Sequence, residues 1–377
     1  MQSGRQKAGV KMEKLEINAE SRERKYPIFI GKSALDNLAG FVRGRFNDSR
    51  VAVIADKKVL SLQKSRIENS LEDIDALLIP VVGSESSKSR EMKEKIEDLL
   101  LDNKFGRDTL IIAIGGGVIG DLSGFVASTF NRGVPFIQIP TTLLAMADAS
   151  IGGKTSVNTK HGKNLIGAFH QPAAVFADMD FISSLPDEEF LSGLAEIIKI
   201  AVAADKSLFD FLKQNSAKIL YKDEQALTHI LRRSIELKKE IVEKDPEESG
   251  LRQILNFGHT FGHALELLSG FRIKHGFAVS GGILIEAEIS SLTGNLSIDE
   301  KNEIIHLLKK FGFPLAVDSG IDSDKIIELM LSDKKSRKQK PRFVILENIG
   351  AAKSHSSSFS FEIEKNLIKK SIDNCKK

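Results

Sequence analysis

The first half of the chain alternates short, continuously apolar runs with longer amphipathic stretches. Four such runs lie at residues 51–55, 76–82, 109–114 and 136–140, and the stretch 89–101 between two of them has helical periodicity. Strands of a parallel sheet have this composition because helices cover both faces of the sheet. The alternation therefore predicts an α/β domain built on an open parallel sheet.

The second half has a different pattern, and helical periodicity dominates it after Pro186. It recurs in six segments, at residues 187–203, 206–215, 224–243, 251–268, 276–293 and 298–311. A chain of 377 residues is long enough for two domains. We therefore expect an α/β domain over residues 1–180 and a mostly α-helical domain over residues 181–377. Residues 1–11 read as an extension, because Met12 opens the first strand-like stretch and is an alternative start.

Composition excludes several classes of protein. Hydrophobic residues make up 41% and charged residues 28%, as in ordinary soluble proteins, and a net charge of +3 is too small to indicate a nucleic-acid partner. No apolar run reaches the roughly 18 residues of a membrane span, and the polar N-terminus lacks the apolar core of a secretory signal. The single cysteine, Cys375, excludes a disulfide framework and a thiolate metal site. We expect a cytoplasmic protein that binds neither membrane nor nucleic acid.

A glycine-rich turn follows the third apolar run. Gly115-Gly116-Gly117-Val118-Ile119-Gly120 matches G-x-G-x-x-G and precedes a helix-compatible stretch. Glycines let the backbone approach a diphosphate, and the N-terminus of the next helix offers free N–H groups. In an ordinary Rossmann domain this fingerprint follows the first strand, whereas here at least two strands precede it. We therefore expect a Rossmann-like but non-standard nucleotide-binding domain.

Three histidines form a candidate metal site in the second half. His259 and His263 are four residues apart, so on a helix they point the same way, and His275 follows beyond a break at Ser269-Gly270. With Glu196 from an upstream helix they offer the nitrogen and oxygen donors that zinc prefers, and catalytic zinc commonly takes three protein ligands. The alternative is that one or two of these histidines are core residues hydrogen-bonded to backbone.

Polar residues suited to an anionic, hydroxylated small molecule surround this site in the sequence. Gly152-Gly153-Lys154-Thr155 resembles a phosphate-binding loop, but a P-loop is excluded because Asp148 stands where its first glycine belongs. Glu196 and Lys199 share one helix face. The remaining members are cationic or amide side chains that precede the histidine helix or follow glycines: Lys163, Asn164, Lys238, Arg252 and Asn256. Solvated loop lysines are the alternative for Lys154 and Lys163.

In combination these motifs resemble the 3-dehydroquinate synthase family of sugar phosphate cyclases. The resemblance runs from about Asp56 to about Ile349 and rests on GGGVIGD, RGVPFIQIPTTLLA, GGKT, GKNLIGAFHQP, GLAEIIK, LNFGHTFGHA, a later HG, and DKK followed by RFVIL. It implies an N-terminal NAD-binding domain, a helical C-terminal domain and a site between them. The implied reaction converts 3-deoxy-D-arabino-heptulosonate 7-phosphate (DAHP) into 3-dehydroquinate and phosphate, in the shikimate pathway, by transient NAD oxidation, phosphate elimination, re-reduction and aldol cyclisation.

The resemblance also implies a role for individual residues. Glu196, His259 and His275 would hold one divalent metal per subunit, zinc or cobalt, and His263 would be a polar site residue rather than a ligand. Substrate positions are matched by Asp148, Lys154, Asn164, Lys199, Lys238, Arg252, Asn256 and a lysine of Lys334-Lys335, with Lys335 as our choice. NAD positions are matched by Asp56, Glu85, Lys88, Gly115, Gly116, Gly117, Asp121, Thr141, Thr142, Lys154 and Lys163. Arg132 matches an arginine that, in the family's homodimer, reaches the neighbouring subunit's substrate phosphate.

Two departures and three rival interpretations accompany the resemblance. Phe277 stands where many relatives have Glu, which predicts the loss of a polar contact beside the metal but not of a ligand; His170 replaces a common Tyr, a tolerated variation.

A polyol dehydrogenase of the glycerol dehydrogenase type would use an Asp and two His as ligands, which Glu196 contradicts. A cyclase acting on sedoheptulose 7-phosphate has no substrate carboxylate to bind, which Arg252 and Asn256 contradict. An inactive binding protein would have lost metal ligands, and none is lost.

Overall fold

The sheet predicted from the apolar runs is present and parallel. The computed structural model describes residues 25–315, 318, 320–332 and 341–376. The four runs form β2 (Arg50–Asp56), β3 (Ala76–Val81), β4 (Thr109–Gly115) and β5 (Phe136–Pro140), and two further strands, β1 (Ile28–Gly31) and β8 (Ala174–Asp178), complete a sheet of order β1-β8-β5-β4-β2-β3. Every pairing in it is parallel. The predicted α/β class is confirmed.

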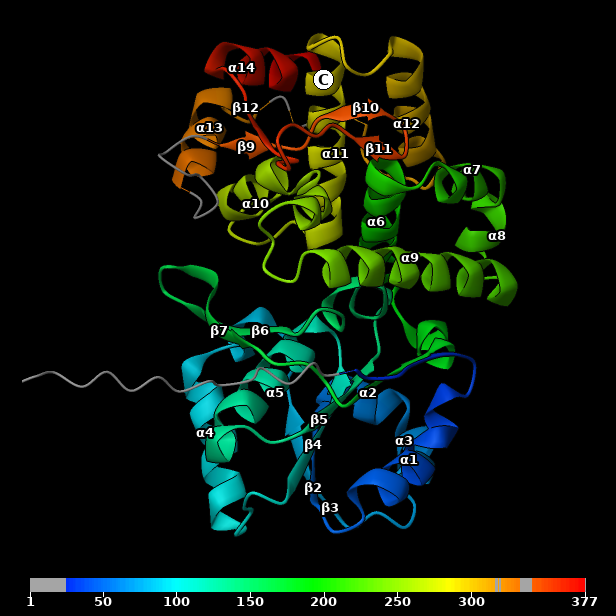
Figure 1. Cartoon of the computed structure of the whole chain (residues 1–377), viewed down its shortest axis with the longest axis vertical. Helices are drawn as coiled ribbons and strands as arrows, with labels where there is room; N and C mark the ends of the chain where they lie inside the picture. The colour runs from blue at the N-terminus through cyan, green and yellow to red at the C-terminus, as the bar shows by residue number, and fades with distance from the viewer. Residues whose placement is uncertain (1–24, 316–317, 319, 333–340, 377) are drawn as a thin grey trace, which may run out of the picture.

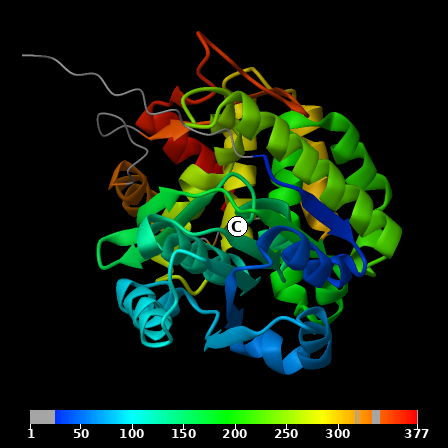
Figure 2. The same ribbon diagram turned by 60° about the horizontal axis from the view of Figure 1, so that its bottom comes forward.

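Helices cover both faces of this sheet, as the continuous apolar strands require. In β2, Val51 and Val53 belong to one core cluster while Ala52 and Ile54 belong to another on the opposite face. The covering elements are α1 (Leu38–Phe46), α2 (Lys57–Leu62), α3 (Lys64–Ser70), α4 (Arg90–Asp102) and α5 (Gly117–Thr129), with short 3-10 turns at Ala34–Asn37, Glu85–Ser87, Phe130–Arg132 and Met179–Ser184. Figure 2 shows the N-terminal elements, in dark blue, at one side of the sheet and α4, in cyan, at the other.

The second half is helical, and Figure 1 shows it stacked on the sheet region. Its helices are α6 (Asp187–Ala204), α7 (Lys206–Gln214), α8 (Ser216–Leu220), α9 (Glu224–Lys244), α10 (His259–Leu268), α11 (His275–Leu292), α12 (Ile298–Lys310), α13 (Ser323–Ser332) and α14 (Lys365–Asn374). Two short antiparallel pairs accompany them: β9 (Arg342–Phe343) with β12 (Phe361–Glu362), and β10 (Leu346–Asn348) with β11 (Ala351–Ala352).

The expectation of one continuous helix over residues 251–268 is wrong. A 3-10 turn at Leu251–Asn256 ends before Phe257, and α10 starts at His259. Gly258 between them has φ +77°, a left-handed conformation that glycine adopts without a steric cost, and a Cβ there would lie 3.0 Å from the Val279 carbonyl oxygen. Because of this break, Asn256 belongs to the 3-10 turn and His259 to α10.

A second feature that the sequence did not predict is an antiparallel hairpin of β6 (Lys154–Thr159) and β7 (Gly162–Phe169). It carries Lys154 and Lys163, for which solvated loop lysines were the alternative interpretation. Figure 1 shows the tip of this hairpin projecting from the sheet region toward α10. A π-helical turn at Ala145–Ala149 precedes it and carries Asp148. Residues of the α/β half thereby lie close to the helical half.

The predicted division near residue 180 falls between the end of β8 at Asp178 and the start of α6 at Asp187. As a domain boundary it stays a prediction. The extension at residues 1–11 lies outside the described residues. Among the helices that the structure describes, none combines the length and the apolar composition that crossing a membrane requires.

The packing of α10 against α11 yields a stability prediction. A Cβ at Gly282 would lie 1.8 Å from the Gly258 carbonyl oxygen, whereas a Cβ at Gly281 would meet side chains only at 3.7 Å. Gly282→Ala should therefore lower the free energy of unfolding by about 1–3 kcal/mol or more. Gly281→Ala, the control, should leave it unchanged or raise it, because alanine is the better helix former. Equal denaturant midpoints for the two variants would contradict the close approach.

Candidate metal and substrate site

Three elements meet at the residues expected to hold the metal. Glu196 lies within α6, and His259 and His275 are the first residues of α10 and α11. Glu196 Oε1 lies 3.2 Å from His275 Nε2 and 3.5 Å from His259 Nε2. One donor atom from each residue falls within 4.8 Å of the other two, and Glu196 is 3% exposed. The structure therefore brings together one carboxylate and two imidazoles from distant parts of the sequence.

Glycine allows this close approach. A Cβ at Gly276 would lie 2.2 Å from the Ser192 carbonyl oxygen, so the first turn of α11 contacts the backbone of α6 directly. The Gly276 N–H also donates to Ser192 Oγ at 3.0 Å. Ser192 precedes Glu196 by one helical turn. The contact therefore sets the separation between His275 and Glu196.

The three residues differ in how readily they lose a proton. Burial opposes ionisation of Glu196, but Lys199 and then the two histidines outweigh it and hold the pKa of this carboxyl well below its usual range. Burial depresses the pKa of His259 well below its usual value, so this imidazole is neutral, as a ligand must be. Burial also acts to lower the pKa of His275, but hydrogen bonds with Glu196 and Glu266 raise it to about 10. His275 therefore keeps its additional ring proton at neutral pH, and a divalent cation bound at Glu196 has to displace that proton.

The donor set fits zinc or a similar divalent ion. A carboxylate and two imidazoles are common zinc ligands and leave a coordination position for water or substrate. A second group, His263, Glu266 and His275, also lies within ligand distance. A lysine contacts the carboxylate of each group, Lys199 that of Glu196 and Lys163 that of Glu266. The first group is the one that the resemblance implies, and His263 lies beside it, with its ring centroid 5.2 Å from that of His259.

Buried cations line the site toward the sheet region. Lys199 Nζ contacts Glu196 Oε2 at 2.5 Å, and Lys238 Nζ donates to Asp148 Oδ1 at 2.6 Å. Both lysines are almost fully buried. Burial acts to raise the pKa of Asp148, but Lys238 and Lys199 outweigh it and the pKa is lowered; burial lowers the pKa of Lys238 despite this partner. Each of these lysines is paired with a carboxylate, so the arrangement places two ion pairs in a poorly solvated region, where electrostatic interactions are strong.

The loop before α10 adds further polar groups. Asn256 Nδ2 donates to Glu248 Oε1 at 2.6 Å, and Lys154 contacts the other oxygen of Glu248. Arg252 is 3% exposed and donates to the Pro246 carbonyl oxygen. Lys154, Arg252 and Asn256 therefore converge from the hairpin and this loop, as the resemblance implies.

Three residues of the site were not identified from the sequence. Glu248 bridges Lys154 and Asn256, Glu266 contacts His275, and Tyr26 lies against Gly152 and Arg252 with its pKa raised by burial. For Glu266 a signal was present, because it follows His259 by seven residues and His263 by three and so shares their helix face. No comparable periodicity marks Glu248 or Tyr26.

The residues matched to NAD positions gather at the carboxyl edge of the sheet. Asp56 ends β2, Gly115 ends β4, and Thr141 follows β5, and these strands are neighbours in the order β5-β4-β2. Gly116 caps α5, and Gly117 is its first residue. A Cβ at Gly116 would lie 3.2 Å from Thr142 Cγ2, so the two turns are in contact. This edge is where ligands bind in open α/β sheets.

A buried ion pair lies beside that edge. Lys88 Nζ contacts Asp121 Oδ2 at 2.5 Å, and burial raises the pKa of Asp121 although Lys88 opposes the rise. Asn164 Oδ1 accepts from Lys88 and from Ser156 Oγ. Asn164, matched to a substrate position, therefore contacts NAD-matched residues rather than the metal group. Glu85 accepts from Asn158 Nδ2 at 2.7 Å and lies 3.7 Å from Lys163 Nζ.

Arg132 stands apart from this cluster. Arg132 is exposed at the end of a 3-10 turn, and Asn131 and Arg132 have φ of +47° and +70°. Two successive left-handed non-glycine residues store backbone strain of the kind that concentrates at functional sites. Lys334 and Lys335 lie outside the described residues.

The two departures have structural explanations. Phe277 packs edge-on against Phe313, with ring centroids 5.7 Å apart, and so contributes to the apolar core. Phe277 has no polar group to offer His275, and the carboxylate that the structure places there is that of Glu266, whose Oε2 lies 3.2 Å from His275 Nδ1. His170 stacks on Phe136 and its Nε2 lies 2.9 Å from the Val134 carbonyl oxygen. Its contacts are structural, in line with a tolerated variation.

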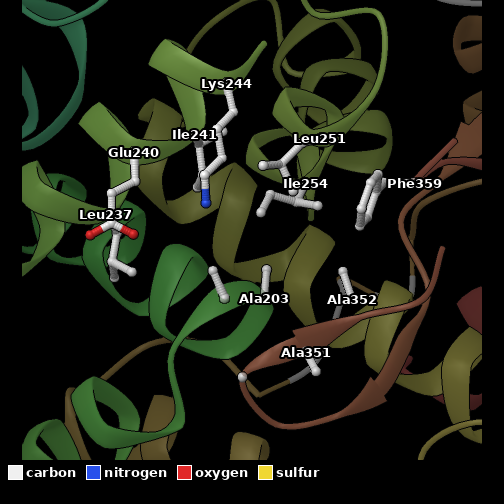
Figure 3. Close-up of a pocket in the computed structure, with 12 residues that line it drawn as sticks. Ala203, Leu237, Glu240, Ile241, Lys244, Leu251, Ile254, Ala351, Ala352 and Phe359 are labelled. Atoms are coloured by element: carbon white, nitrogen blue, oxygen red, sulfur yellow. The ribbon is translucent and has the colours of Figure 1, made fainter. Parts of the chain in front are cut away.

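Two cavities lie on a different face of the elements that carry the substrate-matched residues. One, of about 230 Å³, is lined by Leu237, Ile241 and Lys244 of α9, by Leu251 and Ile254, and by Phe359 and the β10–β11 turn (Figure 3). The other, of about 450 Å³, adjoins it through Lys244, Leu251 and Phe359. Lys238 lies on another face of α9. None of the metal-matched residues lines either cavity.

Comparison with known proteins agrees with this geometry. The family model described as 3-dehydroquinate synthase N-terminal matches residues 78–192, and the one described as 3-dehydroquinate synthase C-terminal matches residues 193–336. A curated 3-dehydroquinate synthase of Thermodesulfovibrio yellowstonii is 43% identical over 366 residues, covering 96% of this chain and 100% of that protein. This chain belongs to the 3-dehydroquinate synthase family.

Solved structures of related cyclases share the fold. A 2-epi-5-epi-valiolone synthase from Streptomyces hygroscopicus, described with NAD⁺ and Zn²⁺ bound, superposes with a TM-score of 0.85 at 25% identity, covering 95% of this chain and 98% of that one. A 2-deoxy-scyllo-inosose synthase, described with carbaglucose-6-phosphate, NAD⁺ and Co²⁺, gives 0.84 at 25% identity, covering 92% and 96%. The predicted combination of a sheet domain and a helical region is therefore that of sugar phosphate cyclases.

The metal assignment predicts a difference among the three clustered histidines. His275→Ala should lose most of the bound zinc and nearly all activity, because it removes one of three ligands. His263→Ala should keep its zinc while losing activity, because His263 lies beside the ligand set. Metal content after gel filtration, measured by atomic absorption, separates the two outcomes. Undiminished zinc in His275→Ala would contradict the assignment.

Proposed function

We propose that this chain is a 3-dehydroquinate synthase that converts DAHP into 3-dehydroquinate and inorganic phosphate. Membership of the family over nearly the whole chain supports the reaction, and the carboxylate–bis-imidazole group beside buried lysines supports the chemistry. The enzyme is a carbon–oxygen lyase that eliminates phosphate. The observation that carries the proposal is that Glu196, His259 and His275 meet next to Lys199, Lys238 and Arg252.

The cofactors are NAD and one divalent metal, zinc or cobalt. When bound, NAD supplies a reversible hydride acceptor and the metal supplies a Lewis acid for the substrate hydroxyl that is oxidised. The glycine turn and the residues that end β2 and β5 offer the nucleotide a position at the carboxyl edge of the sheet. Glu196, His259 and His275 offer the metal its ligands.

The chain's own residues have separate tasks in this reaction. Lys199 keeps Glu196 ionised and fixed, because its ammonium contacts the oxygen that the histidines leave free. Buried Lys238 and partly exposed Asp148 hold each other in a position from which either can contact a substrate hydroxyl. Burial removes most of the water around Lys238, which strengthens its electrostatic effect on charge that develops in the substrate.

The remaining polar and cationic side chains are suited to bind the anionic ends of the substrate. Glu248 contacts both Lys154 and Asn256, so a substrate carboxylate or phosphate can replace it as their partner. Arg252 is buried, and its planar guanidinium suits bidentate binding of a carboxylate. We assign these three residues to substrate binding, with His263, Asn164 and Lys335 as further substrate residues by resemblance.

The rival cyclase and dehydrogenase functions have less support. The related cyclases acting on other sugars are 25% identical to this chain, against 43% for a curated 3-dehydroquinate synthase. A sedoheptulose phosphate would leave Arg252 without a carboxylate partner, and an unpaired buried charge is costly. Glu196 in place of an Asp ligand argues against a polyol dehydrogenase.

The proposed working unit is a cytoplasmic homodimer in which Arg132 serves the partner subunit's site. Its exposure and its strained backbone support a role outside its own subunit's site. A guanidinium there would bind the phosphate of the partner's substrate through two hydrogen bonds. Neither nucleic acid nor membrane is a proposed partner.

One assay tests the proposed reaction. Purified protein supplied with DAHP and catalytic NAD⁺ should release inorganic phosphate and form 3-dehydroquinate without net accumulation of NADH. Prior treatment with a chelator should abolish phosphate release, and added zinc or cobalt should restore it. Sedoheptulose 7-phosphate serves as the matched control substrate. Turnover of the control with none of DAHP would contradict the proposed function.

The shared site predicts complementation between two inactive variants. Arg132→Ala should be nearly inactive while remaining folded and dimeric, whereas Arg107→Ala, at another exposed arginine of the same half, should keep its activity. A mixture of Arg132→Ala with Lys199→Ala should regain activity, because one site of each hybrid dimer has both residues intact. Absence of recovery, in a mixture shown to exchange subunits, would mean that Arg132 acts within its own chain or not at all.

A further inference from the structure

A carboxylate that the proposed mechanism does not use lies behind the metal group. Glu266 is 4% exposed in α10 and lies on the same helix face as His259 and His263. Its Oε2 lies 3.2 Å from His275 Nδ1, while the opposite nitrogen of that ring, Nε2, lies 3.2 Å from Glu196 Oε1. Glu266 therefore holds the far side of the ring whose near side faces the metal position.

The other oxygen of Glu266 is held from the sheet region. Lys163 Nζ donates to Glu266 Oε1 at 3.1 Å and lies 4.3 Å from the centre of the Phe271 ring. The same ammonium lies 3.7 Å from Glu85 Oε1. Lys163 is the second residue of β7, in the hairpin that projects toward α10 in Figure 1. A continuous set of contacts thus runs from Glu85 through Lys163 and Glu266 to His275.

We infer that Glu266 is a positioning residue for His275 and that Lys163 sets its place, so that the β6–β7 hairpin and the metal centre are coupled. The inference rests on the proposed function only in assigning the metal to Glu196, His259 and His275. A carboxylate that accepts the Nδ1–H of a histidine fixes the tautomer and the ring orientation, leaving Nε2 to bind the metal. Here that carboxylate has a second anchor on a separate structural unit.

Coupling of this kind is reciprocal. If the position of the hairpin affects how firmly His275 is held, then metal binding affects the position of the hairpin by the same free energy. Glu85 and Lys163 both match NAD positions. The contact chain therefore links the metal centre to the part of the sheet region that is expected to meet the nucleotide, across the boundary between the two halves.

Metal affinity, measured on the full chain without substrate, tests the inference. Competition with a chromogenic chelator for zinc should show Glu266→Gln binding roughly 10- to 100-fold more weakly than the unmodified protein. Glu288→Gln is the matched control, since Glu288 is also a buried carboxylate paired with a lysine, Lys301 at 2.8 Å. It should bind zinc normally. Thermal unfolding of the metal-free proteins shows whether each variant is folded.

Lys163→Met distinguishes a positioning role of Lys163 from a purely electrostatic one, because the two would change the zinc affinity in opposite directions. Removal of a positive charge near a cation should by itself strengthen metal binding. Positioning predicts weaker binding instead, because Glu266 loses one of its two anchors. In a double-mutant cycle the two substitutions together should cost no more than Glu266→Gln alone. The visible spectrum of the cobalt-loaded protein should also change in Glu266→Gln, because the ring orientation changes.

Several outcomes would overturn the inference. Unchanged zinc affinity in Glu266→Gln would remove the positioning role, and tighter binding or a fully additive loss in Lys163→Met would remove the coupling. Loss of zinc in His263→Ala as large as that in Glu266→Gln would make Glu266 a ligand of the second group. None of these measurements uses DAHP, so failure to release phosphate would contradict the proposed function without affecting them.

Discussion

The site depends on one buried carboxylate. Glu196 is nearly inaccessible to water, and an isolated charge in such a place is costly. Lys199 on the same helix and two imidazoles from other helices offset that cost, and all three reach it at 3.5 Å or less. Because each partner comes from a different turn or helix, the starts of α10 and α11 have to lie against α6. Gly276 permits the contact of α11 with α6 and Gly258 the contact of the start of α10 with α11, since a side chain at either position would meet backbone.

The two halves of the chain contribute complementary parts of the chemistry. Parallel strands place their carboxyl ends at one edge, which collects the glycine turn with Asp56 and Thr141. The helical half supplies Glu196, His259 and His275, which are matched to the metal, and most of the cationic side chains. Contacts of charged residues around the site then cross between the halves: Lys238 with Asp148, Lys154 with Glu248, and Lys163 with Glu266. Hydride transfer requires the nucleotide and the oxidised carbon to be adjacent, and these contacts hold the two sets of residues together.

Helices and strands with a strong apolar periodicity were predictable from the sequence. Elements that depend on one glycine conformation or on tertiary contacts were not. The four long strands and α6, α7, α9, α11 and α12 begin and end within one or two residues of the predicted segments. The segment 251–268 was mispredicted because one left-handed glycine, Gly258, interrupts an otherwise apolar period. The β6–β7 hairpin was missed because its residues are polar and glycine-rich; in the structure it packs against α5.

The sequence by itself determined the fold class, the donor types and the family, because apolar periodicity and residue chemistry are local properties. The residue pattern alone left open which of the three histidines join Glu196, and only the resemblance implied His259 and His275 with His263 beside them. The structure puts His275 Nε2 3.2 Å from Glu196 Oε1, and it puts Glu266, which was not identified from the sequence, 3.2 Å from His275 Nδ1. Those relations are distances between segments remote in the chain. The packing of α6, α10 and α11 fixes these distances. Apolar periodicity places residues on one face of a helix, but it does not say which other element packs against that face.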